Sequence, residues 1–366
     1  VPEADRGLLH AGAAILAVAF LVKAGIWPLN FWLVPAYASA SAPVAALFAI
    51  MTKVGLYAVL RLWTLLFSGQ AGASAHFGGE WLIYGGLVTL AVAAVSILAA
   101  QRLERMAALS ILVSAGTLLG AVGFAQAALT GAALFYLVNS TLALCALFLL
   151  AELVERSRSA NEAPLDEEED AMPPPLESLH PPKGINLDDE QKVVIGQIIP
   201  WTMAFLGLSF IACALLIIGM PPLSGFASEW LLLQALIAAW RVGDLAFQIG
   251  AAAATALAAL AVALSAAAML RFYGMVFLGR PRSPRAAGAT ELSGVARAAL
   301  ILPAALTVIF GLTPGFLLEL AAPERAVLAG PRLEERSLVE QRLPLSLSHL
   351  LALSAQQFGG NANFAD

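Results

Sequence analysis

Eight predominantly apolar runs of roughly 17 to 25 residues, the length of a membrane-crossing helix, follow one another along most of the chain. A further run at 226–240 is too short to cross a membrane comfortably. The pattern predicts an all-α integral membrane protein with about eight transmembrane helices. The eight runs occupy residues 8–27, 43–66, 82–100, 106–125, 132–151, 198–220, 249–273 and 296–317.

Two of the predicted helices contain residues that interrupt a helix. The first carries Gly25 and Pro28 near its end. The second is segment 198–240, which we interpret as one membrane helix with a break in its middle, because prolines and glycines deny the backbone a continuous helix there. The residues at this second break are Pro221, Pro222 and Gly225.

The positive charges of the short loops favour one crossing rather than two over 198–240. Lys and Arg in short loops prefer the cytoplasmic side. A single crossing puts Arg102 and Arg105 on the same side of the membrane as a later arginine cluster, whereas two crossings would separate them. The single crossing also predicts that both termini are periplasmic. The later cluster consists of Arg280, Arg282 and Arg285.

Charge and apolar content divide the chain into four segments. The net charge is −5, yet residues 152–192 hold 12 acidic and four basic side chains, so the membrane body carries a small positive excess. We interpret 153–197 as a flexible, acidic, proline-containing cytoplasmic loop, for which a solvated insertion is favoured over a regulatory contact. It separates helices one to five, at 1–152, from helices six to eight, at 198–320. A less apolar tail follows at 321–366.

The composition excludes a soluble enzyme, because 60% of the residues are hydrophobic and only 12% are charged, against about 25% charged in soluble domains. The sequence has no Gly-rich phosphate loop, no nucleophile elbow and no His or Cys cluster with metal-ligand spacing. Cys145 and Cys213 both lie in apolar runs, which predicts neither a disulfide framework nor a cysteine metal site. We expect no cofactor, no metal and no nucleic-acid partner.

Three ionisable residues within the predicted helices are the candidate chemistry of this chain: Lys23, Lys53 and Glu229. Placing such a side chain at mid-bilayer costs about 2.5 to 3.5 kcal/mol, and these residues usually face a bundle interior or a water-filled path. Burial disfavours the charged form of a lysine, so a neighbouring charge can switch it between its two protonation states. We therefore predict that the three residues form a proton pathway.

Lys23 and Glu229 fall beside the two helix breaks. Lys23 precedes the first break, where the C-terminus of a helix favours a cation. The alternative to a role in the pathway is that the long side chain of Lys23 extends to the membrane interface. Glu229 lies about one turn into the half-helix after the second break, where the helix dipole favours an anion and Ser224 is a candidate cap. Lys53 is near the centre of its helix. Arg61, two turns later, is equally an interfacial anchor or a partner of the pathway.

Four short sequences resemble the D-type subunit of the Mrp/Pha-type multisubunit monovalent cation/proton antiporters. The same superfamily includes the antiporter-like, proton-pumping subunits of respiratory complex I. The resemblance implies a module of fourteen helices with two inverted five-helix repeats, of which this chain corresponds to the last eight. The sequences are VKAGIWPLNFWL at 22–33, APVAAL at 42–47, MTKVG at 51–55 and GMPPLSG at 219–225.

The resemblance also implies roles for single residues. Lys23 corresponds to the lysine of the first broken helix, Lys53 to the connecting lysine and Glu229 to the charged residue of the second broken helix. The chain departs from the family at Asn30 and Asn139, where members often have histidine, and at Glu229, where many have lysine. An asparagine holds a water chain but does not carry a proton by changing charge, so both asparagines are accessory candidates.

The resemblance implies a transporter subunit rather than an enzyme. We expect it to exchange protons for Na+ or K+ in the bacterial inner membrane, in contact with other antiporter subunits and with lipid, and the acidic loop favours the potassium-linked branch. One alternative is a proton-pumping subunit of a complex I-like NADH:quinone oxidoreductase or a membrane hydrogenase. Another is a truncated, transport-inactive membrane scaffold, because nothing in the chain matches the first six helices of the module.

Overall fold

The computed structural model describes residues 3–69, 71–159, 201–221, 223–240, 245–277 and 294–313. Within these residues the fold is entirely helical, with one short 3-10 turn and no strand. The α-helices are α1 (Glu3–Ala24), α2 (Leu33–Ser39), α3 (Ala42–Leu66), α4 (Gly79–Ala99), α5 (Leu103–Gly123), α6 (Ala127–Ser159), α7 (Trp201–Ile218), α8 (Ser224–Ala239), α9 (Leu245–Val276) and α10 (Gly294–Leu312).

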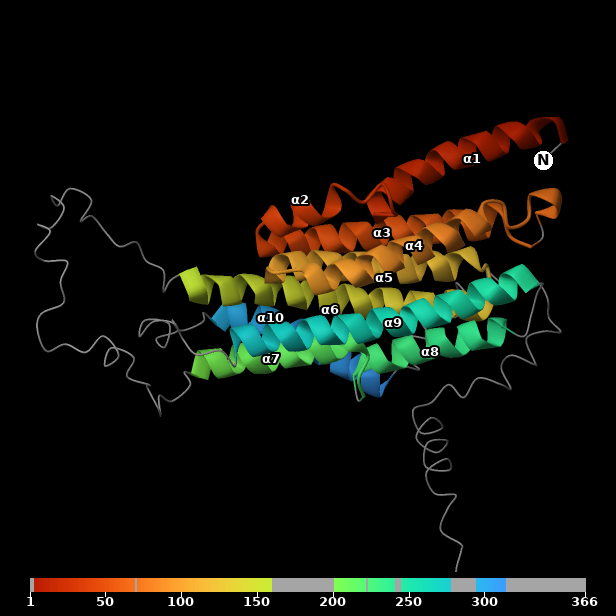
Figure 1. Cartoon of the computed structure of the whole chain (residues 1–366). Coiled ribbons are helices and arrows are strands. Elements are labelled where there is room, and N and C mark those ends of the chain that lie inside the picture. The colour runs from red at the N-terminus through yellow and green to blue at the C-terminus, as the bar shows by residue number, and fades with distance from the viewer. Residues whose placement is uncertain are drawn as a thin grey trace, which may run out of the picture.

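The long helices lie side by side in a bundle, and α1 is inclined away from the others (Figure 1). Seven helical segments of the described chain are long and apolar enough to cross a membrane. The shorter apolar helices α7 and α8 follow each other end to end along the bundle, and together they make an eighth crossing (Figure 1). The predicted all-α fold with about eight crossings is confirmed.

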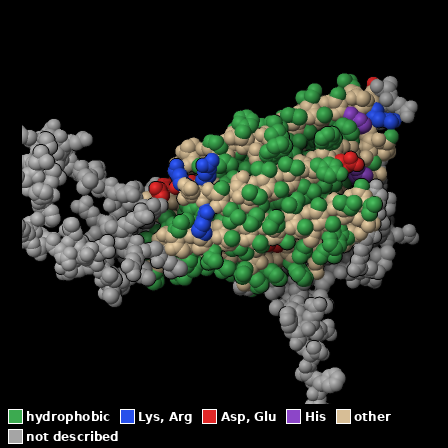
Figure 2. All heavy atoms as spheres, viewed as in Figure 1, with side chains coloured by type: hydrophobic (Ala, Val, Ile, Leu, Met, Phe, Trp, Pro, Cys, Tyr) green, Lys and Arg blue, Asp and Glu red, His purple; other side chains and the backbone are tan. Residues whose placement is uncertain are grey.

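The visible outer surface of the bundle is apolar over most of its length (Figure 2). Single large side chains are almost fully exposed on it, including Leu8 at 78% and Trp81 at 82%. Exposed apolar surface of this extent is unfavourable in water, whereas a lipid environment solvates it. The chain is therefore a multi-pass membrane protein.

The first break lies where the sequence predicts it. α1 ends one residue before Gly25, whose φ of +78° is a conformation that favours glycine. Two backbone groups beside the break bond to side chains. The Trp27 N–H donates to Oγ1 of Thr89 over 2.8 Å, and the Trp32 indole N–H donates to the Val22 carbonyl over 3.2 Å. These bonds replace helical hydrogen bonds that the break removes.

The second break separates α7 from α8. α7 ends one residue before Gly219, whose φ is +73°, and Pro221 lies in the connecting turn. Pro222 lies outside the described residues. Gly225 is the second residue of α8 rather than part of the turn, and the absence of a Cβ there leaves room for the carbonyl of Leu216. The interruption predicted near the proline pair is confirmed.

α4 and α5 contact each other backbone to backbone through glycines. A Cβ added at Gly86 of α4 would lie 2.9 Å from the carbonyl oxygen of Gly116 on α5, and a Cβ at Gly123 would lie 2.7 Å from the carbonyl oxygen of Gly79. Small residues allow this approach in membrane bundles, where tight packing rather than the hydrophobic effect holds helices together. The contact fixes α5, the most buried of the crossing helices, at the centre of the bundle.

Two charged side chains bind helix ends at the same end of the bundle. Arg271 of α9 donates to the carbonyl of Leu98 over 2.6 Å and also to that of Ala100, at the C-terminus of α4. Oε2 of Glu152 on α6 accepts from the Ala42 N–H at the start of α3 over 2.9 Å. Each charge has the sign that the helix dipole favours, and each satisfies a terminal backbone group.

The order of the helices agrees with a single crossing by α7 and α8. The end of α9 lies at the same end of the bundle as the turn between α4 and α5 (Figure 1). Arg102 is at that turn. The later arginine cluster at 280, 282 and 285 lies outside the described residues.

Some helices extend beyond the predicted apolar runs. α1 begins at Glu3, and α6 continues to Ser159, seven residues into the segment interpreted as a loop. The 33 residues of α6 correspond to about 50 Å at 1.5 Å per residue, more than the ~30 Å hydrocarbon core. Backbone hydrogen bonding thus continues where the apolar run ends. Residues 160–197 of the acidic segment and the 321–366 tail lie outside the described residues.

We expect Gly116→Ala to destabilise the bundle. Its Cβ would overlap backbone atoms of Leu90 and Gly86, which are held within α4, whereas a Cβ at Gly120 meets no atom within 4 Å. Overpacking costs about 1 to 3 kcal/mol, so the thermal unfolding midpoint of the detergent-solubilised protein should fall for Gly116→Ala. Gly120→Ala is the matched control and should keep or raise the midpoint, because alanine favours a helix. Equal midpoints would contradict the contact.

Candidate functional site

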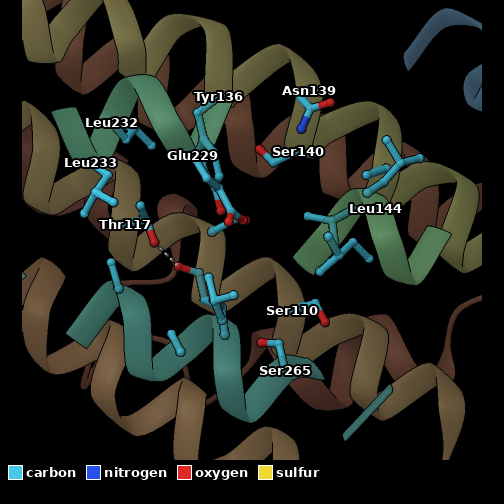
Figure 3. A pocket seen from close by; sticks show the side chains of 18 of the residues that line it. Ser110, Thr117, Tyr136, Asn139, Ser140, Leu144, Glu229, Leu232, Leu233 and Ser265 are labelled. Atoms are coloured by element: carbon cyan, nitrogen blue, oxygen red, sulfur yellow. Dashed lines mark hydrogen bonds between the residues drawn. The ribbon is translucent and has the colours of Figure 1, made fainter. Parts of the chain in front are cut away.

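The interior of the bundle contains a cavity of about 310 Å³ between α5, α6, α7, α8 and α9. Much of its wall is Leu, Ala, Val and Ile, but polar side chains project into it from several helices (Figure 3). Among the described residues, Glu229 is the one charged residue of this wall. The hydroxyl and amide groups of the wall belong to Ser110, Ser114, Thr117, Tyr136, Asn139, Ser140 and Ser265.

Lys53 reaches this wall through a single hydroxyl. The lysine lies on α3 and is only 2% exposed. Its Nζ donates to Oγ of Ser114 on α5 over 2.5 Å, and Ser114 lines the cavity. Within the described chain the structure shows no carboxylate paired with Lys53. A buried ammonium therefore has a neutral hydroxyl as its hydrogen-bond partner, which leaves its charge uncompensated in a medium of low dielectric constant.

Glu229 occupies the second turn of α8, as its position after the break predicts. Its carboxylate projects into the cavity (Figure 3). It also lies directly against the α-carbon of Gly219, where an added Cβ would overlap it. Glycine is therefore required at position 219 for two reasons. Its φ is positive, and the carboxylate of Glu229 occupies the space that a Cβ would need.

Asn139 holds the start of α8. This residue of α6 is buried, and its Oδ1 accepts a hydrogen bond from the Ser224 hydroxyl. Its Nδ2 donates to Oγ of Ser228 over 3.2 Å. The expectation that Ser224 caps α8 is wrong, because Leu223 occupies the cap position and the Ser224 hydroxyl binds Asn139 instead. The amide thus fixes the half-helix that carries Glu229.

Lys23 lies in the last turn of α1 and is half-buried. Its aliphatic carbons pack across Gly55 of α3, since a Cβ at that position would be 3.3 Å from Cγ of Lys23. Gly55 follows Lys53 by two residues on α3, so Lys23 packs on a side of that helix roughly opposite to the one from which the Lys53 side chain projects. Asn30 is half-buried in the turn between α1 and α2 and does not line the cavity.

Arg61 is the remaining sequence candidate. It lies on α3 about two turns beyond Lys53, away from the cavity wall. Its Nη1 is buried and has no hydrogen-bond partner among the described residues. The structure therefore does not join Arg61 to Lys53 or to Glu229, and both roles considered for it stay predictions.

Sequence reasoning missed the hydroxyl groups of α5. Ser110, Ser114 and Thr117 are spaced by four and three residues and share one face of α5, whose other residues after Arg105 are apolar or glycine. This spacing was the available signal. Together with Glu229, the hydroxyls offer hydrogen-bond partners to water, and the cavity has room for several molecules at roughly 30 Å³ each. The arrangement is chemically suited to moving protons between Lys53 and Glu229.

Comparison with known proteins identifies relatives of most of the helical region. The family described as "NADH:quinone oxidoreductase/Mrp antiporter, TM" matches residues 4–255, which include Lys23, Lys53 and Glu229. The chain is 50% identical over 232 residues to a probable K(+)/H(+) antiporter subunit, of the D type, from Rhizobium meliloti (strain 1021). That alignment covers 63% of this chain and 41% of the relative.

Two solved structures share the fold. A chain of the Mrp complex from Dietzia sp. DQ12-45-1b superimposes with a TM-score of 0.65 at 20% identity, covering 87% of this chain and 59% of that chain. A chain of respiratory complex I from Thermus thermophilus gives a TM-score of 0.61 at 22% identity, covering 86% and 58%. The chain thus spans less than two thirds of the length of each of these relatives.

We expect Gly219→Ala and Glu229→Ala to be energetically coupled. In Gly219→Ala the alanine has to adopt a left-handed backbone conformation, and its Cβ displaces the carboxylate of Glu229. In a Glu229→Ala background only the backbone strain remains. The two substitutions should therefore be non-additive, by about 0.5 to 3 kcal/mol as for residues in contact. Thermal unfolding of the four proteins in detergent measures the coupling. The same loss of stability from Gly219→Ala in both backgrounds would show that the carboxylate does not lie on Gly219.

Proposed function

Because the chain belongs to the NADH:quinone oxidoreductase/Mrp antiporter family of membrane proteins, we propose that it is a subunit of a monovalent cation/proton antiporter. The observation that carries this proposal is the cavity that joins the hydroxyl partner of Lys53 to the carboxylate of Glu229. The R. meliloti relative is named as a K(+)/H(+) antiporter subunit, which favours K+ over Na+ as the exchanged ion.

The proposed proton route runs from Lys23 along α3 to Lys53, through Ser114 into the cavity, and on to Glu229. A proton that moves from protonated Lys53 to ionised Glu229 turns two buried charges into two neutral groups. In a low dielectric medium the charged pair is costly to maintain unless the charges attract each other, so the two protonation states depend on one another. Access of water or of the exchanged cation to either end of this route then decides whether the two groups are charged or neutral.

The chain is proposed to work within a hetero-oligomer in the bacterial inner membrane. Support comes from the R. meliloti relative, which is named as one subunit of an antiporter, and from the large apolar side chains exposed on the outer surface of the bundle. The loop-charge argument orients the chain with the acidic segment in the cytoplasm and both termini in the periplasm. Other subunits of the antiporter are its proposed partners.

A redox-driven pump is the second candidate function. The family description includes NADH:quinone oxidoreductase, and a complex I chain shares the fold. Proteins that copurify with the chain from native membranes distinguish the two functions. Small antiporter subunits support the antiporter, whereas dehydrogenase subunits with electron-transfer activity in the same particle support the pump.

We expect Lys53→Met to abolish cation-dependent proton transport. Methionine fills similar space but removes the ammonium, and a proton-transfer group typically contributes about a hundredfold or more to a rate. Proton flux in membrane vesicles that contain the assembled complex measures the effect. Lys23→Met should cause a comparable loss. Arg102→Met is the control, because Arg102 is 71% exposed at the bundle end. Undiminished flux in both lysine variants would reject the route.

Glu229→Gln should also stop transport while the protein still assembles. Glutamine keeps the shape of the side chain beside Gly219 but does not take up a proton. The loss of flux should be about a hundredfold or more, and the thermal unfolding midpoint should not fall. A variant that transports normally would show that protons do not need the carboxylate.

A further inference from the structure

Two serines of α5 line the cavity, and a hydrogen bond from Lys53 distinguishes them. Ser110 and Ser114 are each 3% exposed and both line the cavity. Each hydroxyl also donates to a carbonyl of its own helix, Ser110 to Met106 over 3.0 Å and Ser114 to Ile111 over 2.8 Å. Only Ser114 accepts a hydrogen bond from Lys53. The difference identifies the hydroxyl through which the lysine meets the cavity.

Lys53 itself does not line the cavity. Among the described residues, the thiol of Cys145 on α6 also lies close to Lys53. It donates to the Ala46 carbonyl over 3.4 Å and does not line the cavity either. Among the described residues, Ser114 is thus the hydrogen-bond partner of Lys53 that lines the cavity, which Glu229 also borders.

We infer that Ser114 is a relay hydroxyl, which passes protons between Lys53 and water in the cavity. The inference rests on the proposed function, since it needs Lys53 to be a proton carrier. A serine hydroxyl has one hydrogen to donate and two lone pairs that accept. In the structure Oγ accepts from Nζ of Lys53 while its own hydrogen points to the Ile111 carbonyl.

The transfer begins when the hydroxyl hydrogen of Ser114 turns from Ile111 to a cavity water. One N–H bond of Lys53 then breaks and its proton forms a new O–H bond on Oγ, while the original hydroxyl proton passes to the water. The resulting hydronium gives a proton to the carboxylate of Glu229. Lys53 has become a neutral amine and Glu229 a neutral acid, the water is restored, and Ser114 keeps one hydrogen. Rotation of the hydroxyl back to Ile111 resets the relay.

Three variants and one control variant of the assembled complex in membrane vesicles test the relay. Ser114→Ala should lower the maximal rate of proton flux by about tenfold or more, with the half-saturating cation concentration unchanged. Ser114→Thr should restore the rate, because it keeps the hydroxyl and its methyl group has room in the cavity. Ser110→Ala removes a hydroxyl from the same wall without touching Lys53, so its loss should be much smaller. Ser96→Ala, on the exposed face of α4, is the neutral control.

Several outcomes would overturn the relay. A rate for Ser114→Ala near that of the unmodified protein would do so, as would equal losses for Ser110→Ala and Ser114→Ala or a failure of Ser114→Thr to restore transport. If Ser114→Ala does not assemble, Ser114→Cys replaces it as the test. A thiol has a volume similar to that of the hydroxyl but forms weak hydrogen bonds, so this variant should also slow transport. Normal flux with Lys53→Met would reject Lys53 as a proton carrier in the proposed route, whereas an inactive Lys53→Met beside an active Ser114→Ala rejects the relay alone.

Discussion

The hydrogen bond from Lys53 to Ser114 is the contact on which the interior of this bundle depends. An ammonium buried among apolar helices is costly unless a partner satisfies it, and the structure supplies a hydroxyl from the helix at the centre of the bundle. α5 occupies that centre because its glycines let α4 approach to backbone contact. The same helix then presents its hydroxyl face to the cavity, so close packing on one side of α5 positions the polar wall on the other.

The two broken helices are held by different chemistry, and the difference follows from their places in the bundle. At the first break the freed backbone groups bond to Thr89 and to the indole of Trp32. At the second break the side chains of the half-helix itself bond to Asn139. A backbone interruption in lipid is tolerated only where its polar groups are satisfied. Each break lies within about two helical turns of a charged residue, Lys23 in the last turn of α1 and Glu229 in the second turn of α8.

The sequence was sufficient to predict the membrane-crossing helices, both breaks and the positions of the intramembrane charges, because these depend on local composition, but it did not predict the short helix α2. It was not sufficient for contacts between distant segments. Ser224 has the spacing of a helix cap, yet it binds an amide 85 residues away. Ser110 and Ser114 are indistinguishable along the chain, since both bond to their own helix. Only the position of α3 decides which of them meets a lysine, and that position is a property of the packed bundle.

The neutrality of Asn139 matters for how the cavity works. An amide keeps the same charge at every pH, so it fixes α8 without adding a titrating group beside Glu229. The carboxylate is then the one charge that the described residues bring to the cavity wall, and its counterpart is Lys53 behind Ser114. A proton that passes between these two groups changes both charges together and leaves their sum at zero. The proposed transfer would therefore avoid accumulating net charge in a low-dielectric interior.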